Sequence, residues 1–311
     1  MGDAVKSAHR FRIVAVLAVV LALAAPASVG AAQTQPGSAG SGGLVATRTL
    51  VGAGDIATCT RTSDSETATL VNDVLTADTT AVAITMGDNV YPYATASYLN
   101  SCYGPTWGVF KSRTRPVPGN HEFIKNTKAY YNYFGSRAGK FGRGYYKADL
   151  AGWRVFFLNS ECAVTSSCTA QYNWVAADLA ANPRQCTMAI WHRARFSSGS
   201  EHGNSMRMAS MFQLLYENGA EVVLSGHEHL YERFAPLDPS GAPTSVGTRQ
   251  FVSGLGGGGL YPLADTPQPG SEVRYNANFG VLKMTLAPGS YTWEFLTVDD
   301  QTIDQGADTC H

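Results

Sequence analysis

The chain has 311 residues, of which 44% are hydrophobic and 15% are charged. It is therefore long enough for one large domain with a full core, or for two small ones. Its 23 basic and 24 acidic residues leave a net charge of -1, and no basic run follows the N-terminal segment. This balance argues against a polyanionic partner, so we expect no nucleic-acid binding.

The N-terminal segment has the pattern of a targeting signal. Basic residues at positions 6, 10 and 12 precede an apolar run over residues 13–25. A run of this length is typical of a secretory signal and is too short to span a bilayer. We therefore predict a signal peptide at residues 1–32, a secreted or extracytoplasmic protein, and no transmembrane span in the mature form. An uncleaved N-terminal anchor is the alternative. The polar Gly/Ser/Pro stretch 33–43 predicts a flexible linker, followed by one domain over residues 44–311.

Six cysteines follow the predicted signal. An even number of cysteines in an exported chain indicates disulfides, and six cysteines allow 15 pairings. We favour a local loop, a link between two loops near the candidate site, and a link from the C-terminal tail to the start of a strand. These are Cys162–Cys168, Cys59–Cys102 and Cys186–Cys310.

The first half of the domain alternates strand and helix. Apolar strands are predicted over residues 48–55 and 81–86, with a helix over 62–77 between them, which makes a βαβ unit. Ser63 and Glu66 fit a capping box at the start of this helix. Residues 91–115 are predicted to be mostly loop, and two strands over 145–159 are predicted to form a hairpin around Ala151 and Gly152.

The second half begins with the same alternation and then becomes β-rich. Helices are predicted over residues 170–181 and 205–218, and apolar strands over 187–192 and 221–229. Further strands are predicted over residues 249–253, 280–286 and 290–298, the last two as a hairpin. The pattern predicts an α/β (α+β) fold with a mixed sheet and outer helices in a single domain.

Polar side chains follow five of the predicted strands, at or near the point where each strand ends. They occur in the blocks Gly54-Asp55, Gly87-Asp88-Asn89-Val90-Tyr91, Gly119-Asn120-His121-Glu122, His192 and Gly226-His227-Glu228-His229. The carboxyl ends of parallel strands meet at one edge of a sheet, where ligands bind. On a strand, the two-residue spacing of His227 and His229 would put both on one face. Carboxylate, amide, phenol and imidazole groups that converge in this way predict a two-metal site.

Taken in order, these blocks resemble the signature blocks of the calcineurin-like metallophosphoesterases. Tyr91, three residues after Asp88, resembles the purple acid phosphatase branch, in its small single-domain form. The motifs span residues 54–229. The resemblance implies a four-layer α/β/β/α sandwich of two mixed sheets flanked by helices, with a dinuclear metal site at the C-terminal ends of the strands. The chain has Ala57 where the first block of the family often has glycine, which leaves the shape of that loop open.

The resemblance also implies a role for each matching residue. An Fe(III) ion would be bound by Asp55, Asp88, Tyr91 and His229, and a divalent Fe, Zn or Mn ion by Asp88, Asn120, His192 and His227. Asp88 would bridge the two metals. His121 would contact the phosphate and protonate the leaving group. His202 matches a further substrate-contacting histidine.

The function implied is that of a secreted metal-dependent phosphoric ester hydrolase. It would cleave small phosphate monoesters by attack of a metal-bound hydroxide. A phosphodiesterase or nucleotidase that uses the same site is the alternative. A secreted binding protein on a catalytically dead scaffold is a third hypothesis, against which the complete ligand set counts. Tyr91 could also pack rather than bind metal, and His202 could be an ordinary loop histidine. The sequence leaves the oligomeric state open.

Overall fold

The computed structural model describes residues 46–125, 128–165 and 168–311. The predicted signal peptide and linker lie outside the described residues, so both stay predictions. Within the described part of the chain, no helix has both the length and the apolar character needed to cross a membrane.

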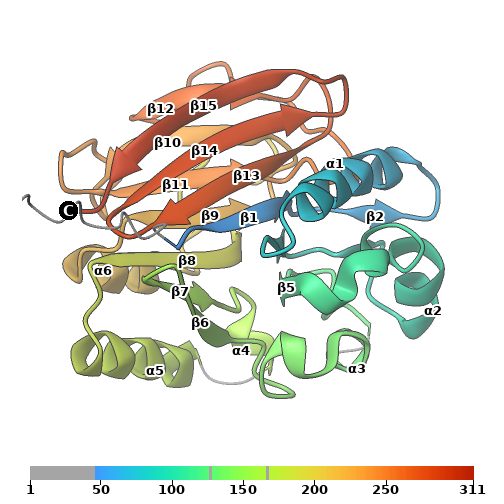
Figure 1. The fold of residues 1–311 in the computed structure, drawn as a ribbon, viewed down its shortest axis with the longest axis horizontal. Coiled ribbons are helices and arrows are strands. Elements are labelled where there is room, and N and C mark those ends of the chain that lie inside the picture. The colour runs from blue at the N-terminus through green and yellow to red at the C-terminus, as the bar shows by residue number, and fades with distance from the viewer. Residues whose placement is uncertain (1–45, 126–127, 166–167) are drawn as a thin grey trace, which may run out of the picture. The chain divides into compact units, whose positions relative to one another are not determined.

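The first sheet has six strands in the order β15-β14-β13-β1-β3-β5 (Figure 1). The strands are β1 (Arg48–Ala53), β3 (Val82–Met86), β5 (Thr114–Val117), β13 (Gly280–Ala287), β14 (Ser290–Thr297) and β15 (Thr302–Thr309). Strands β1, β3 and β5 pair in parallel, and β13 joins β1 in antiparallel orientation. The carboxyl ends of β1, β3 and β5 therefore meet at one edge of this sheet.

The second sheet has seven strands in the order β12-β10-β11-β9-β8-β7-β6. They are β6 (Tyr146–Leu150), β7 (Trp153–Phe157), β8 (Cys186–Arg193), β9 (Val222–Gly226), β10 (Tyr231–Leu237), β11 (Thr248–Ser253) and β12 (Ser271–Tyr275). Strands β7, β8, β9 and β11 pair in parallel. Two short strands, β2 (Ala57–Thr58) and β4 (Val90–Tyr91), form a separate parallel pair.

Helices cover the outer face of each sheet. The described helices are α1 (Ser63–Ala77), α2 (Ala96–Tyr98), η1 (Leu99–Tyr103), η2 (Trp107–Arg113), α3 (Ala129–Phe134), η3 (Gly135–Ala138), α4 (Cys162–Thr165), α5 (Cys168–Ala181) and α6 (Ala209–Glu217). Val71 of α1 packs in one buried cluster with Val51 of β1. Phe212 of α6 packs in another with Val223 of β9.

A third apolar cluster fills the space between the two sheets. It joins Leu50 and Ile84 of the first sheet to Phe157 and Ile190 of the second. In β1, Leu50 faces this central cluster while Val51 faces the helices. Because both faces of the inner strands are buried, their sequences are continuously apolar. The fold is thus the four-layer α/β/β/α sandwich of two mixed sheets that the sequence resemblance implied.

Most predicted elements are confirmed, with shifts of a few residues at their ends. The predicted capping box is wrong. Ser63 lies inside α1, Thr62 precedes the helix without a side-chain cap, and Ser63 Oγ donates to Gly257 O at 2.8 Å. The prediction that residues 91–115 are mostly loop is also wrong, because α2, η1 and η2 occupy most of that range. Strands β10, β12 and β15 were not predicted. The edge strand β15 has the sequence TIDQGADT, and its burial does not follow an apolar alternation that a pattern search could find.

All three predicted disulfides are present. Cys59 pairs with Cys102, Cys162 with Cys168, and Cys186 with Cys310. Cys186 is the first residue of β8, as expected for a link from the C-terminal tail to the start of a strand. The described residues include no free cysteine.

Candidate metal centre

Oxygen donors come from the edge of the first sheet. Asp55 follows β1, Asp88 follows β3, and Asn120 follows β5, while Tyr91 ends the short strand β4. Asp55 and Asp88 have positive φ angles of 59° and 48°. This region is unfavourable for most L-residues and tolerated best by Asn and Asp. The chain therefore turns sharply directly after each strand, which directs both carboxylates to the same place.

Nitrogen donors come from the second sheet. His192 lies near the end of β8, and His227 and His229 follow β9, which ends at Gly226. The prediction that both histidines lie on one face of a strand is wrong. His227 has a φ of 73°, so the chain has already left the strand there. The turn sends the rings of His227 and His229 to different neighbours.

The two sheets approach each other closely at Gly54 and Gly226. A Cβ atom built on Gly54 would lie 3.2 Å from the Gly226 Cα, and one on Gly226 would lie 2.7 Å from Asp55 Oδ2. A side chain at Gly226 would therefore displace Asp55. The glycines directly before Asp55 and His227 thus allow oxygen and nitrogen donors from separate sheets to meet.

A first group of donor atoms surrounds the Tyr91 hydroxyl. Its oxygen lies 2.7 Å from Asp55 Oδ1, 3.2 Å from Asp88 Oδ2 and 3.0 Å from His229 Nε2. Asp55 Oδ1 is 3.3 Å from the same His229 nitrogen. Burial, together with the charges of Asp55 and Asp88, holds the pKa of Tyr91 well above its usual value. The phenol therefore requires a nearby cation to ionise.

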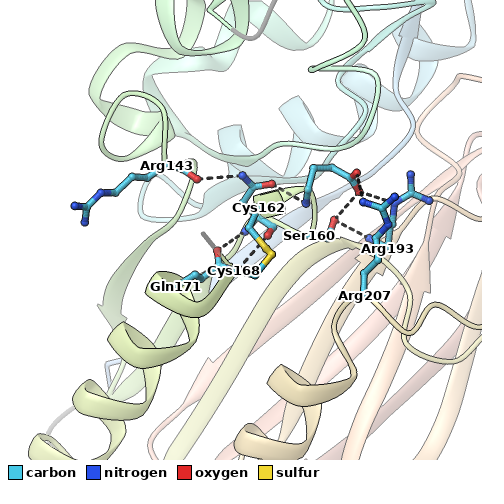
Figure 2. The surroundings of a disulfide bond; sticks show 9 residues. Arg143, Ser160, Cys162, Cys168, Gln171, Arg193 and Arg207 are labelled. Atoms are coloured by element: carbon cyan, nitrogen blue, oxygen red, sulfur yellow. Dashed lines mark hydrogen bonds and ion pairs between the residues drawn. A yellow bond between two sulfur atoms is a disulfide. The ribbon is translucent and has the colours of Figure 1, made fainter. Parts of the chain in front are cut away.

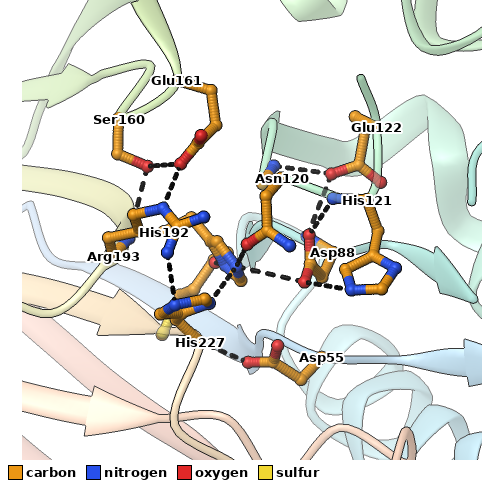
Figure 3. A network of polar contacts seen from close by, with 12 residues as sticks. Asp55, Asp88, Asn120, His121, Glu122, Ser160, Glu161, His192, Arg193 and His227 are labelled. Atoms are coloured by element: carbon orange, nitrogen blue, oxygen red, sulfur yellow. Dashed lines mark hydrogen bonds and ion pairs between the residues drawn. The ribbon is translucent and has the colours of Figure 1, made fainter. Parts of the chain in front are cut away.

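A second group surrounds His192 Nε2 (Figure 3). This nitrogen lies 3.1 Å from Asp88 Oδ2, 3.1 Å from Asn120 Oδ1 and 3.1 Å from His227 Nδ1. Within the described ranges, Asp88, His192 and His227 form a cluster whose ligand atoms all lie within 4.8 Å of one another. Asp88 Oδ2 belongs to both groups, so the two sets of donor atoms meet at this carboxylate.

The chemistry of the donors fits cations. His192 Nδ1 donates to Met86 O at 2.8 Å, which leaves Nε2 to bind a metal ion or a proton. Burial alone would lower the pKa of His192, but the carboxylates of Asp88 and Asp55 raise it to about 9. Burial also opposes ionisation of Asp88, yet the neighbouring His192 and His121 hold the pKa of its carboxyl below the usual range. The cluster thus favours positive charge where these atoms converge.

His121 lies beside the shared carboxylate. Its backbone N–H donates to Asp88 Oδ1 at 2.8 Å, and its Nε2 is 3.8 Å from Asp88 Oδ2. Its Nδ1 donates to Pro92 O at 2.6 Å, and its ring contacts the Tyr91 ring at a centroid distance of 4.5 Å. These contacts fix the ring, and they leave Nε2 as the nitrogen that faces the candidate centre.

His202 also reaches the cluster. Its ring stacks on His227 with centroids 4.1 Å apart and an interplanar angle of 11°. Burial, followed by the charge of Arg193, lowers the pKa of His202. The structure therefore brings all nine predicted site residues together: Asp55, Asp88, Tyr91, Asn120, His121, His192, His202, His227 and His229.

Two buried glutamates hold the loops that carry these residues, and the sequence analysis gave them no role. Glu122 Oε2 accepts from the N–H groups of Gly119 at 2.6 Å and Asp88 at 3.0 Å, and Oε1 accepts from that of Asn89 at 2.9 Å. Burial and the Asp88 charge raise the pKa of Glu122 to about 7. Glu228 Oε1 accepts from the His202 N–H at 2.7 Å. The sequence signal that could have identified Glu122 and Glu228 is that both lie inside the motif blocks.

Arg193 connects the cluster to a neighbouring ion-pair network. Its Nη1 lies 2.6 Å from His227 Nε2, and its Nε donates to Glu161. Arg207 pairs with the same carboxylate at 3.1 Å. Figure 2 shows both arginines beside the Cys162–Cys168 disulfide, on the side away from Gln171.

A loop far along the chain completes the wall of the site. The Tyr261 ring stacks on His229 with centroids 3.8 Å apart, and the Tyr261 N–H donates to His229 O at 3.0 Å. A run of glycines at residues 256–259 precedes it, and Gly258 N donates to Asp55 O at 2.7 Å. Ala57, the departure from the family pattern, is not among the described residues with positive φ, so this loop does not need glycine there.

Two cavities adjoin the cluster, and they share no lining residue. A cavity of about 500 Å³ is lined by Thr58, Thr60, Arg61, Tyr91, Pro92, His121, His229, Gly258, Gly259, Leu260 and Tyr261. A second cavity of about 340 Å³ is lined by Arg193, Glu201, His202, Gly203, Asn204, Ser205, Met206 and His227. A third, of about 370 Å³ beside the Cys162–Cys168 disulfide, has no proposed ligand in its lining.

The family model and the curated relatives that match this chain indicate the same family. Residues 50–231 match the family model described as calcineurin-like phosphoesterase. The chain is 30% identical to purple acid phosphatase 18 of Arabidopsis thaliana over 165 residues, which cover 50% of this chain and 37% of that protein. It is 26% identical to probable purple acid phosphatase 20 of the same plant over 239 residues, or 66% of this chain and 54% of that one. The chain therefore spans about half or less of the curated relatives it matches.

Solved structures share the fold at low sequence identity. The purple acid phosphatase PPD1 of yellow lupin aligns with a TM-score of 0.64 and 18% identity, over 85% of this chain and 54% of that chain. GAP50, the anchor in the inner membrane complex of Plasmodium, aligns with a TM-score of 0.70 and 12% identity, over 86% of this chain and 90% of that chain.

Proposed function

Because the chain belongs to the calcineurin-like phosphoesterase family, we propose that it is a secreted dinuclear-metal phosphatase that hydrolyses phosphate monoesters. The observation that carries the proposal is the position of Asp88 Oδ2. It lies 3.2 Å from the Tyr91 hydroxyl in one donor group and 3.1 Å from His192 Nε2 in the other. A carboxylate shared by two donor groups suits a pair of cations better than one.

The donor types suit two different ions. We assign Asp55, Asp88, Tyr91 and His229 to an Fe(III) ion, because a phenolate is a hard anionic ligand. We assign Asp88, Asn120, His192 and His227 to a divalent Fe, Zn or Mn ion. When bound, such a pair neutralises an anionic phosphate and supplies an activated water molecule.

The surrounding residues act on the substrate. His121 has its Nδ1 proton engaged by Pro92 O at 2.6 Å, so its Nε2 is the nitrogen that can deliver a proton to the leaving oxygen. His202, whose ring stacks on His227 with centroids 4.1 Å apart, lies where it can hydrogen-bond the phosphate. Glu122 and Glu228 hold the backbone of the loops in place through their accepted N–H bonds.

Secretion is supported by two features. Three disulfides are typical of oxidising compartments, and the N-terminal sequence has the signal pattern described above. N-terminal sequencing of the exported protein tests this part. A mature chain that begins close to residue 33 supports it, and recovery of the full-length chain from the membrane fraction favours an uncleaved anchor.

The test of function compares p-nitrophenyl phosphate with bis-p-nitrophenyl phosphate over acid to alkaline pH, with the secreted, metal-loaded protein. We expect faster turnover of the monoester, and loss of both turnover and bound metal in Asp88→Ala. Preference for the diester would change the function to phosphodiesterase. GAP50 shares the fold and is described as an anchor, so a metal-loaded protein that hydrolyses neither ester would favour a binding scaffold.

A further inference from the structure

The two cavities beside the candidate centre differ in chemistry, and His121 lines only the larger one. We propose that the 500 Å³ cavity binds the leaving group of the substrate, and that Leu260 is a specificity residue that favours phosphate esters of large aromatic alcohols. This inference rests on the proposed phosphatase function and specifies the class of its substrates.

The position of His121 gives the side on which the leaving group lies. Hydrolysis forms a bond between phosphorus and the oxygen of water, and breaks the bond between phosphorus and the leaving oxygen. The leaving oxygen takes a proton from His121 Nε2, and solvent returns a proton to the ring. A general acid must lie within hydrogen-bond reach of the atom it protonates. The leaving group therefore lies in the cavity that His121 lines.

The lining of this cavity matches an apolar group. Pro92, Leu260 and Tyr261 supply apolar and aromatic surface, with Tyr91 beside them. The smaller cavity is lined by charged and polar side chains, and Met206 is its one large apolar residue. Ligand pockets for organic groups are typically lined by such apolar and aromatic surface, with a few polar groups. A volume of about 500 Å³ also exceeds what a small alcohol would fill.

Leu260 is the one branched aliphatic side chain in this lining. The Tyr261 ring is already stacked on His229, whereas Pro92 is exposed and offers a smaller apolar ring to the same cavity. The Leu260 residue is 39% exposed. The backbone around it is fixed, because the N–H groups of Gly258 and Tyr261 donate to Asp55 O and His229 O. The backbone thus places Leu260 in the wall of this cavity before any substrate binds.

The experiment compares two aryl esters whose leaving groups are similar in acidity but differ in size, phenyl phosphate and 1-naphthyl phosphate. We expect the wild-type protein to prefer the naphthyl ester. Leu260→Ser should lower kcat/KM for this ester about tenfold, mainly through KM, and lower that for phenyl phosphate less. Met206→Ser is the matched control, since Met206 is 71% exposed and lines the other cavity. It should leave the ratio of the two esters unchanged.

A binding measurement tests the same cavity without turnover. In calorimetry with metal-loaded protein, 1-naphthylmethylphosphonate should bind more tightly than methylphosphonate. Leu260→Ser should reduce the ratio of the two dissociation constants about tenfold. A shift with Met206→Ser instead, or with neither variant, would overturn the assignment, as would an absence of preference in the wild type. If phenyl phosphate is not hydrolysed, the proposed function fails, and calorimetry alone then tests the role of the cavity. In that case, failure of both phosphonates to bind would contradict the assignment of the cavity.

Discussion

Asp88 makes contacts through both its side-chain oxygens and its backbone N–H group. Oδ2 joins the two donor groups, Oδ1 accepts from the His121 N–H at 2.8 Å, and its own N–H donates to Glu122 at 3.0 Å. Its φ of 48° is unfavourable for most residues, so these contacts must hold it there. Glu122 is the group that fixes this conformation, because it binds the loops after β3 and β5 together.

Glu122→Gln should therefore weaken metal binding or catalysis, although Glu122 is not itself a proposed metal ligand. An amide keeps one acceptor oxygen but presents an NH₂ group to at least one of the three N–H donors that Glu122 now accepts. We expect metal affinity or kcat to fall about 10- to 100-fold, the usual cost of losing a residue that orients a ligand. Elemental analysis and steady-state kinetics provide the measurement. Glu66→Gln on the exposed face of α1 is the control, and an unchanged metal content and kcat in Glu122→Gln would contradict this role.

The sequence was sufficient to bring the candidate ligands to attention, but not to give the direction of each side chain. Asp55, Asp88 and Asn120 follow strands and carry glycine before them, a local signal that survives into the fold. The rings of His227 and His229 diverge because of one positive φ, which the residue type histidine does not predict. Tyr261 reaches His229 through tertiary contacts alone, and no motif marks it.

At the scale of elements, strand β8 of the second sheet is connected to the first sheet at both of its ends. Cys186 begins the strand and is bonded to Cys310, which directly follows β15 of the first sheet. His192 lies near the other end, where it meets Asp88. The strand is thus tied to the first sheet by a covalent bond at its start and by the candidate metal centre near its end.

The disulfides should differ in their effect on stability. The Cys186–Cys310 pair is separated by 124 residues, and the Cys162–Cys168 pair by 6. In the chain-entropy model, a longer loop loses more freedom in the unfolded state, which gives about 5 and about 2 kcal/mol respectively. Urea unfolding of the two double Cys→Ser variants should show a larger loss of unfolding free energy for Cys186/Cys310. Equal losses, or the reverse order, would show that native contacts rather than loop length dominate.

At the scale of the whole molecule, the two sheets supply different chemistry. Asp55, Asp88 and Asn120 follow strands of the first sheet, whereas His192, His227 and His229 come from the second. Bound metal would therefore join the sheets across the core that also packs them together. Its contribution to folding follows from preferential binding to the native state.

A chelator should destabilise the wild-type protein and not a variant that cannot bind metal. With free metal at 100 times its dissociation constant, the loss on removal is about 2.7 kcal/mol for each ion. Thermal unfolding with and without EDTA should show a clear drop in Tm for the wild type and none for Asp88→Ala. Equal sensitivity of the two proteins would contradict a structural contribution from the centre.

The division of donors between the sheets has a consequence for how the protein can be monitored. A chain in which one sheet has formed, or in which the two have docked out of register, offers oxygen or nitrogen ligands but not both sets in one place. Such a species would retain little metal through gel filtration, whatever its secondary structure. The ratio of bound metal to protein would then serve as an assay of correct assembly, readable before any substrate has been found.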